Sequence, residues 1–242
     1  MFLLQSKPTL IAAITETNVF SWIKSALTER RNARNGYVRF YPLLTKSILL
    51  GLPCALVFWY QQIHAPIKYG PGVKVRDEPE QIMLAANAEN VMKDGWTLKP
   101  LAQYTFKART LGLKRYQGDA ADALAPYDLA VGWGRMSDEA VLERLNISQD
   151  KRYYHWRYWG TAPIPESEII NHSANIHLIP ADENVAQCIA FLRVGSLVQM
   201  SGWLVEATHQ GADKPWRSSL TRNDEGNGSC EILYVRSLIV TK

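Results

Sequence analysis

One stretch constrains the fold of this chain more than any other: residues 47–63, SILLGLPCALVFWYQQI, which carry no charged side chain. Together with the weakly polar residues before Lys46, the stretch reaches the roughly 20 residues that a helix needs to cross the hydrocarbon core of a bilayer. Trp59 and Tyr60 lie near its end, where an aromatic belt at the membrane surface is expected. The pattern predicts one transmembrane helix over residues 41–63.

Other interpretations of this stretch are weaker. A buried core helix would end at Pro53, but membrane helices tolerate proline better than soluble helices do. A cleaved signal peptide would need an unusually long charged leader, and its small-residue exit at Ala65 is followed by Pro66. A lipoprotein would use Cys54, yet Pro53 stands where a lipobox has a small residue. We therefore expect Cys54 to be a buried thiol in the span.

The distribution of charge orients the span. Residues 1–46 hold seven Lys and Arg against Glu16 and Glu29, a balance of +5, and the whole chain has +4, so the residues after 46 sum to −1. Positive charge collects on the cytoplasmic side of a membrane helix. We therefore expect a cytoplasmic N-terminus and an exported segment of residues 64–242, with the lipid bilayer as one partner.

The segments on either side of the span differ in character. Residues 1–40 form a basic segment in which residues 15–31 have the apolar spacing of an amphipathic helix, suited to the inner leaflet or to packing in a soluble structure. Residues 64–95 begin as a polar stalk rich in Pro and Gly. A short helix is predicted to start at Glu78-Pro79 and to end at Gly95.

Residues 96–242 have the pattern of an exported α+β domain. Tyr104, Phe106 and Ala108 alternate with polar residues, as in a half-buried strand. Further strand patterns cover KRYYHWRYW, SLVQMSGWLVEATHQ, PWRSSLTR and SCEILYVRSLIV, whereas Asp182 caps a helical pattern that ends at Gly195. Many strands with few short helices predict a small barrel or sandwich, and an OB-like barrel is the most specific expectation.

The segment HSANIHLIPAD is the first concentration of polar side chains. It is predicted to form a strand with Asn175, His177 and Ile179 on one face and Ala174, Ile176 and Leu178 on the other. A hydrolase could use His172 or His177 with Ser173, but no Gly-x-Ser-x-Gly motif is present. The histidines lack the spacing of a zinc site. Binding candidates here are His172, Ser173, Asn175 and His177.

The segment WRSSLTRNDEGNGSCE is the second concentration. Its arginines and hydroxyls could hold an anion, or Arg222 and Asp224 could simply pair across a turn. If its arginines converge on Asn175 and His177, the two concentrations form one ligand cleft. The candidates here are Trp216, Arg217, Ser218, Arg222 and Asp224.

Two cysteines lie beyond the span. Cys188 is predicted on the apolar face of its helix, and Cys230 opens the last strand. In an oxidising compartment an even pair favours a disulfide, which here would stabilise by about 2 to 4 kcal/mol. The alternative use of either thiol is as a nucleophile paired with histidine, which a disulfide would preclude.

The segments HSANIHLIPAD, VQMSGWLVEA and WRSSLTRNDEGNGSCE together resemble a group of uncharacterised bacterial membrane-anchored proteins with a single N-terminal transmembrane segment and an exported domain. The similarity covers residues 96–238. It implies a bacterial inner membrane, with residues 64–242 in the periplasm, and it implies no mechanism.

The sequence therefore favours a non-catalytic binding or assembly module whose partner is another envelope protein, a peptide or a glycan. The alternative is a membrane-tethered hydrolase that uses the HSANIH segment with the WRSSLTR hairpin. No cofactor and no metal are expected, and catalytic residues are not assigned. Nucleic acid is not an expected partner, because the exported part is close to neutral.

Overall fold

The computed structural model describes residues 55–59, 61–62, 65–211, 214–221 and 229–241. The chain divides into two units, Met1–Trp59 and Tyr60–Lys242. Of the first unit, residues 55–59 are described, and they are helical. The predicted amphipathic helix and most of the predicted transmembrane helix lie outside the described residues. Within the described ranges, no helix is both long enough and apolar enough to cross a membrane.

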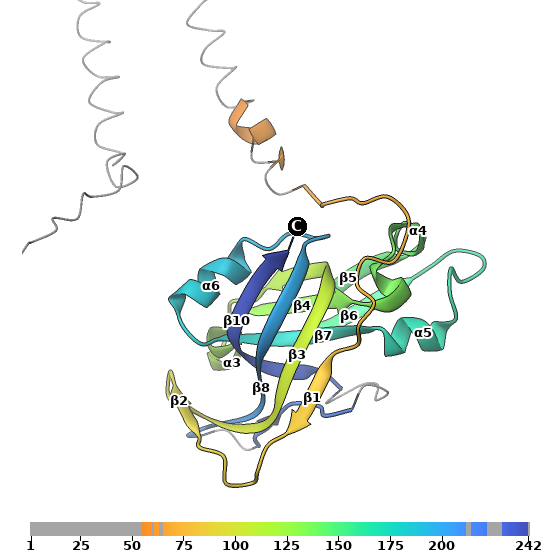
Figure 1. Cartoon of the computed structure of the whole chain (residues 1–242). Coiled ribbons are helices and arrows are strands. Elements are labelled where there is room, and N and C mark those ends of the chain that lie inside the picture. Colours follow the sequence, from red (N-terminus) through yellow and green to blue (C-terminus); the bar gives the residue numbers. More distant parts are fainter. Residues whose placement is uncertain (1–54, 60, 63–64, 212–213, 222–228, 242) are drawn as a thin grey trace, which may run out of the picture. The chain divides into compact units, whose positions relative to one another are not determined.

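The second unit is a strand-rich α+β fold with few short helices, as predicted (Figure 1). The helices are α3 (Ala120–Leu124), α4 (Glu139–Leu142), α5 (Glu166–Asn171) and α6 (Glu183–Ala190), with a 3-10 turn at Gly134–Ser137. The strands are β1 (Glu80–Met83), β2 (Val91–Lys93), β3 (Trp96–Arg115), β4 (Tyr127–Gly132), β5 (Asn146–Asp150), β6 (Tyr153–Arg157), β7 (Ser173–Pro180), β8 (Leu197–His209), β9 (Trp216–Arg217) and β10 (Glu231–Thr241).

The strand pairings close on themselves. β3 pairs with β4, β4 with β7, β7 with β10, β10 with β8, and β8 again with β3. Each of these pairs is antiparallel except β7 with β10, which is parallel. Closing a sheet into a barrel in this way leaves none of the five strands with a free edge along its paired length. Register shifts between Pro100 and Ala102 and between Thr110 and Gly112 mark β-bulges, which bend the long β3 around the barrel.

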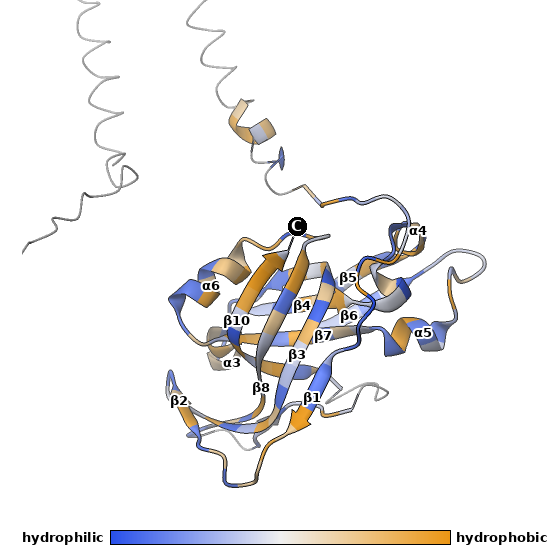
Figure 2. Cartoon of the chain, viewed as in Figure 1, coloured by the Kyte–Doolittle hydropathy of each residue, from blue (hydrophilic) through white to orange (hydrophobic). Residues whose placement is uncertain are grey.

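The barrel interior holds the main hydrophobic core. Tyr104, Phe106 and Ala108 are buried there, so the predicted inward face of β3 is confirmed. Ile176 and Leu178 of β7 join them, as the alternation in HSANIHLIPAD predicted. Figure 2 shows hydrophilic and hydrophobic residues alternating along the barrel strands. This period of two is what directs one face of each strand inward.

A second core lies on the outside of the barrel wall. Leu111 of β3 and Ala130 of β4 are buried under the long connection between β4 and β7. This connection contributes Met136, Ile164 and Ile169, and the β5–β6 hairpin packs Tyr154 and Trp156 against them. The inserted segment therefore covers part of the outer surface of β3 and β4.

Residues 80–95 correct one prediction, because they form β1 and β2 instead of a helix. Asp94 and Gly95 both have positive φ angles, 51° and 81°, and they connect Lys93 directly to its partner Trp96. An Asp-Gly pair is a strong signal for a two-residue hairpin turn. Both short strands pair with β3, whose backbone groups satisfy theirs.

The stalk is not a free linker. Residues 65–79 contain no helix or strand, yet the Ile67 N–H donates to the carbonyl of Val194 (2.8 Å) and the Tyr69 N–H donates to Glu139 (2.8 Å). Glu139 is also paired with Arg109 of β3 at 2.5 Å. Arg109, predicted on a polar face of its strand, is buried by this contact. The stalk is therefore attached to the barrel through a buried ion pair.

Candidate functional site

The first polar concentration begins where α5 passes into β7. Nδ1 of His172 lies 3.0 Å from the carbonyl oxygen of Glu168, and Oγ of Ser173 donates to the carbonyl of Ile169 at 2.6 Å. Both side chains thus bond to the last turn of α5. Satisfying the free carbonyls of a helix end is a structural role.

Asn175 and His177 share the outer face of β7, as predicted, but both are buried there, and both contact a buried carboxylate that is not among the candidates from the sequence. Nδ1 of His177 lies 2.7 Å from Oδ1 of Asp128 on β4, directly across the sheet. Oδ1 of Asp128 also accepts from Nη1 of Arg152 at 2.6 Å. Asn175 lies beside them and accepts from Gln149 at 2.8 Å. We call Asp128, Arg152, Asn175 and His177 the Asp128 cluster.

Arg152 is the link between this cluster and the β5–β6 hairpin. With Lys151 it forms the hairpin turn, where both residues have positive φ angles (50° and 69°). Its guanidinium donates to the carbonyl of Ala125 (2.9 Å), pairs with Asp122 and lies 4.3 Å from the ring centroid of Tyr116. Because Arg152 makes all of these contacts, it holds the tip of the β5–β6 hairpin against the barrel wall.

Burial is the largest influence on the two tyrosines near this hairpin. It raises the pKa of Tyr116, although a hydrogen bond from the Arg152 N–H opposes the increase. It also raises the pKa of Tyr154 to about 12, with the Ser173 hydroxyl opposing it. Both phenols are therefore neutral at physiological pH and can act as hydrogen-bonding groups but not as bases.

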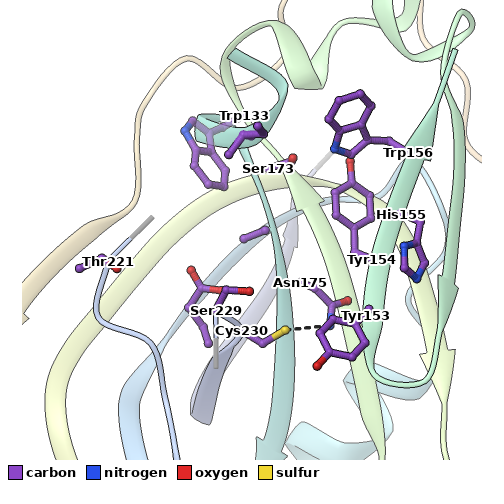
Figure 3. A pocket seen from close by; sticks show the side chains of 13 residues that line it. Trp133, Tyr153, Tyr154, His155, Trp156, Ser173, Asn175, Thr221, Ser229 and Cys230 are labelled. Atoms are coloured by element: carbon purple, nitrogen blue, oxygen red, sulfur yellow. Dashed lines mark hydrogen bonds between the residues drawn. The ribbon is translucent and has the colours of Figure 1, made fainter. Parts of the chain in front are cut away.

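A cleft of about 390 Å³ opens beside the Asp128 cluster (Figure 3). It lies between the β5–β6 hairpin and β7, with the start of β10 on a further side. In Figure 3 the side chains of Tyr154 and Trp156 project from β6 into the space near Ser173. The lining combines aromatic rings with hydroxyl, amide, thiol and carboxyl groups: Trp133, Tyr153, Tyr154, His155, Trp156, Ile170, Ser173, Ala174, Asn175, Thr221, Ser229, Cys230 and Glu231.

The second polar concentration meets the first at Trp216, whose ring centroid lies 5.1 Å from that of His177, and at Cys230, whose Sγ lies 4.0 Å from Nδ2 of Asn175 (Figure 3). Arg217 pairs with Glu206, its partner in the β8–β9 register, and is half exposed. Arg217 therefore does not meet the condition for one shared ligand cleft, because it follows Trp216 on β9 and successive residues of a strand point to opposite faces. Arg222 and Asp224 lie outside the described residues.

Ser218 is a structural residue. It is buried, donates to the carbonyl of Ser219 at 2.8 Å and accepts from the Ile232 N–H at 3.0 Å. Its hydroxyl thus ties the segment after β9 to β10. It is not among the residues that line the cleft.

The predicted disulfide is not found, because no bond joins Cys188 and Cys230 in this structure. The parallel pairing of β7 and β10 explains this: Glu231 is level with Ile176, and Val235 is level with Pro180. Cys230 therefore lies at the start of β7, whereas α6, which carries Cys188, follows its end. Cys188 is also exposed, so its predicted place on the buried face of α6 is wrong.

Asp128 and Arg152 are not among the candidates from the sequence, which predicts residues 151–159 only as a strand. Asp128 had a usable signal, since a single carboxylate within the apolar strand YDLAVG requires a buried partner. Arg152 had no such signal in the sequence, because its partners come from three separate segments. Among the described residues, no group of three or more His, Cys, Asp or Glu side chains could hold a metal ion.

Comparison with known proteins identifies no relative: no family model, no curated protein and no solved structure matches this chain. The strand order and the cleft therefore carry the functional argument.

Proposed function

We propose that this chain is a single-pass protein of the bacterial inner membrane, anchored by residues 41–63, whose periplasmic OB-like barrel is a non-catalytic binding or assembly module. Its partner is another envelope protein, a peptide or a glycan, held in the cleft beside the Asp128 cluster.

The strand order supports the OB-like assignment. In chain order the barrel strands are β3, β4, β7, β8 and β10, and around the barrel they run first, second, third, fifth and fourth. This is a five-stranded barrel with a helix, α6, between its third and fourth strands. OB-folds bind oligonucleotides and oligosaccharides on the face of their second and third strands. The equivalent strands here are β4 and β7, which carry Asp128, Asn175 and His177.

The cleft is the observation that carries the proposal. Its volume of about 390 Å³ is within the range of ligand sites, which are roughly 300–1,000 Å³. Its lining offers aromatic surface for stacking and several neutral hydrogen-bonding groups. Such a lining suits an uncharged polymer segment better than a small ion.

The geometry does not favour the hydrolase. Ser173 and His172 bond to different carbonyls of α5, so within the described chain no base is positioned on this serine. Asp128 orients His177 as a catalytic carboxylate would, but the His177 ring packs on Trp216. A nucleophile within hydrogen-bond reach of the histidine is what a hydrolase site needs.

The test is a binding screen with the full chain in detergent, probed with random-sequence peptides and with bacterial cell-wall glycans. Thr221→Trp adds bulk at the exposed rim of the cleft, Ser173→Leu adds it beside Tyr154, and Lys107→Trp on exposed β3 surface is the matched control. We expect bound probes to lose at least tenfold in affinity with both cleft variants and to be unchanged with the control. Equal binding by all variants, or ester and amide hydrolysis that is lost in Ser173→Ala, would overturn the proposal.

A further inference from the structure

One edge of β6 faces the cleft, and no described strand pairs with it. β6 pairs on one side with β5, and among the described strands it has no partner on the other side. The turn at Lys151 and Arg152 contains two residues, so Asp150 and Tyr153 form the first hydrogen-bonded pair of the hairpin. In an antiparallel ladder the next residue along each strand points its N–H and C=O away from the partner. Tyr154 and Trp156 are the residues so placed.

A contact of β7 establishes which way this edge faces. The carbonyl oxygen of Arg152, two residues before Tyr154 and on the same side of the strand, accepts from Nδ2 of Asn175 at 3.1 Å. Asn175 belongs to β7 and lines the cleft. The backbone N–H and C=O groups of Tyr154 and Trp156, which come next on the same edge, therefore lie along the cleft.

Elsewhere in the described part of the chain, no hydrogen bond from another residue reaches the backbone groups of Tyr154 or Trp156 on this side. β7 cannot supply one, because its own two edges are occupied by β4 and β10. The next neighbours across the cleft are side chains: Ser173 and Asn175 of β7, and Cys230 before β10. An unpaired strand edge is a template for another extended chain.

We propose that the cleft binds an extended peptide segment of a partner protein, which adds as a third strand to the β5–β6 sheet along β6. This inference rests on the proposed binding function and specifies its ligand. The peptide backbone bonds to Tyr154 and Trp156. Its alternate side chains face the floor formed by Ser173, Asn175 and Cys230, and the others face solvent, as in β-strand addition to a sheet edge.

A peptide fits this edge better than a glycan does. The N–H and C=O groups along a strand repeat at the spacing of a second strand, so an extended backbone satisfies them in succession. The polar floor also accepts peptide side chains of mixed chemistry. The partner is therefore recognised mainly through its backbone, with modest sequence selectivity.

The test uses peptides enriched from a random-sequence library on the full chain in detergent. Each enriched peptide is resynthesised with N-methyl groups at alternate positions, in the two possible registers. We expect one register to lose at least tenfold in affinity and the other to be unchanged, because only alternate amides of an added strand face β6. Amide hydrogen exchange resolved to single residues should slow at least tenfold at Tyr154 and Trp156 on binding, and should not change at His155, which already bonds to β5.

The outcomes separate this inference from the proposed function. One contrary result is peptides that bind the cleft, tolerate N-methylation equally in both registers and leave hydrogen exchange at Tyr154 and Trp156 unchanged. That result would contradict strand addition but would still support a binding function for the cleft. Glycan binding that is sensitive to Thr221→Trp, with no peptide enriched, would have the same effect. Failure of both probe classes would remove the proposed function as well.

Discussion

Asp128 and Arg152 are 24 residues apart in the chain, yet Nη1 of Arg152 lies 2.6 Å from Oδ1 of Asp128. The Asp128 side chain is fully buried, whereas the Arg152 side chain is 20% exposed. The same oxygen accepts from His177 of β7. One ion pair thus connects the tip of the β5–β6 hairpin to two strands of the barrel, and it positions the hairpin edge that borders the cleft.

Removing Asp128 should destabilise the protein strongly. Asp128→Ala leaves His177 and one arm of Arg152 without their shared acceptor, and a buried hydrogen-bonding group left without a partner costs about 1–3 kcal/mol. Arg217→Ala is the matched control, since its pair with Glu206 is half exposed and such pairs contribute about 0–1 kcal/mol. Urea denaturation of both variants measures the difference. Equal losses would mean that the Asp128 cluster does not stabilise the fold.

The attachment of the stalk should weaken in acid. Burial would raise the pKa of Glu139, but hydrogen bonds from the Tyr69 N–H and from Arg109 outweigh it, so the pKa lies below the ordinary value of 4.5. A carboxyl group whose pKa is lowered by folding stabilises the protein above the unfolded-state pKa. That contribution is lost as pH falls from about 4.5 through the folded-state pKa.

Denaturation between pH 7 and pH 3 tests this pH dependence. Glu139→Gln should reduce the loss of stability below pH 4.5, because its amide does not titrate. Glu143→Gln, whose partner Lys68 is exposed, is the control and should follow the wild type. A pH profile of Glu139→Gln that matches the wild type would contradict the prediction.

Gly202 should not tolerate a side chain. A Cβ atom added there would lie 2.0 Å from the backbone oxygen of Tyr234, on the neighbouring β10. Gly202→Ala must therefore push two paired barrel strands apart, and overpacking of this kind costs about 1–3 kcal/mol. Gly70→Ala, where a Cβ has no neighbour within 4 Å, should change stability by no more than about 0.5 kcal/mol. Thermal unfolding of the two variants compares them directly.

The two thiols should react without prior reduction. Cys188 is exposed and Cys230 is partly exposed, so a maleimide should label both in the native protein, Cys188 faster. Addition of a reductant before labelling should not increase the extent of reaction. Cys188→Ser should remove the fast phase alone. Labelling of either cysteine only after reduction would support the disulfide between Cys188 and Cys230, which this structure does not show.

The membrane topology should place the barrel outside the cytoplasm. A reporter enzyme that is active only in the periplasm, fused after Lys242, should be active, because the basic segment before residues 41–63 stays in the cytoplasm. Deleting residues 41–63 from the fusion should abolish that activity. Activity of a reporter that works only in the cytoplasm would reverse the assignment.

The sequence by itself determined the local character of the barrel. Alternation predicted β3 and β7, strand-type composition and turn signals predicted β6, β8 and β10, and Asp182 caps α6 as expected by accepting from the Val185 N–H. These features depend on neighbouring residues, which a single sequence displays. The Asp94-Gly95 turn is equally local, but Gly95 alone is also typical of a helix end, and the helix predicted on that basis is wrong.

Only the tertiary structure decided the site. Whether Ser173 meets a histidine, whether Cys188 reaches Cys230 and which partner neutralises Asp128 all depend on strand order and on the parallel pairing of β7 with β10. Arg152 illustrates the reason: a surface-type residue in a hairpin turn pairs with a distant strand, and its partners lie on separate segments of the chain. The packing of the whole barrel decides which distant strands pair, and the local sequence pattern does not predict these pairings.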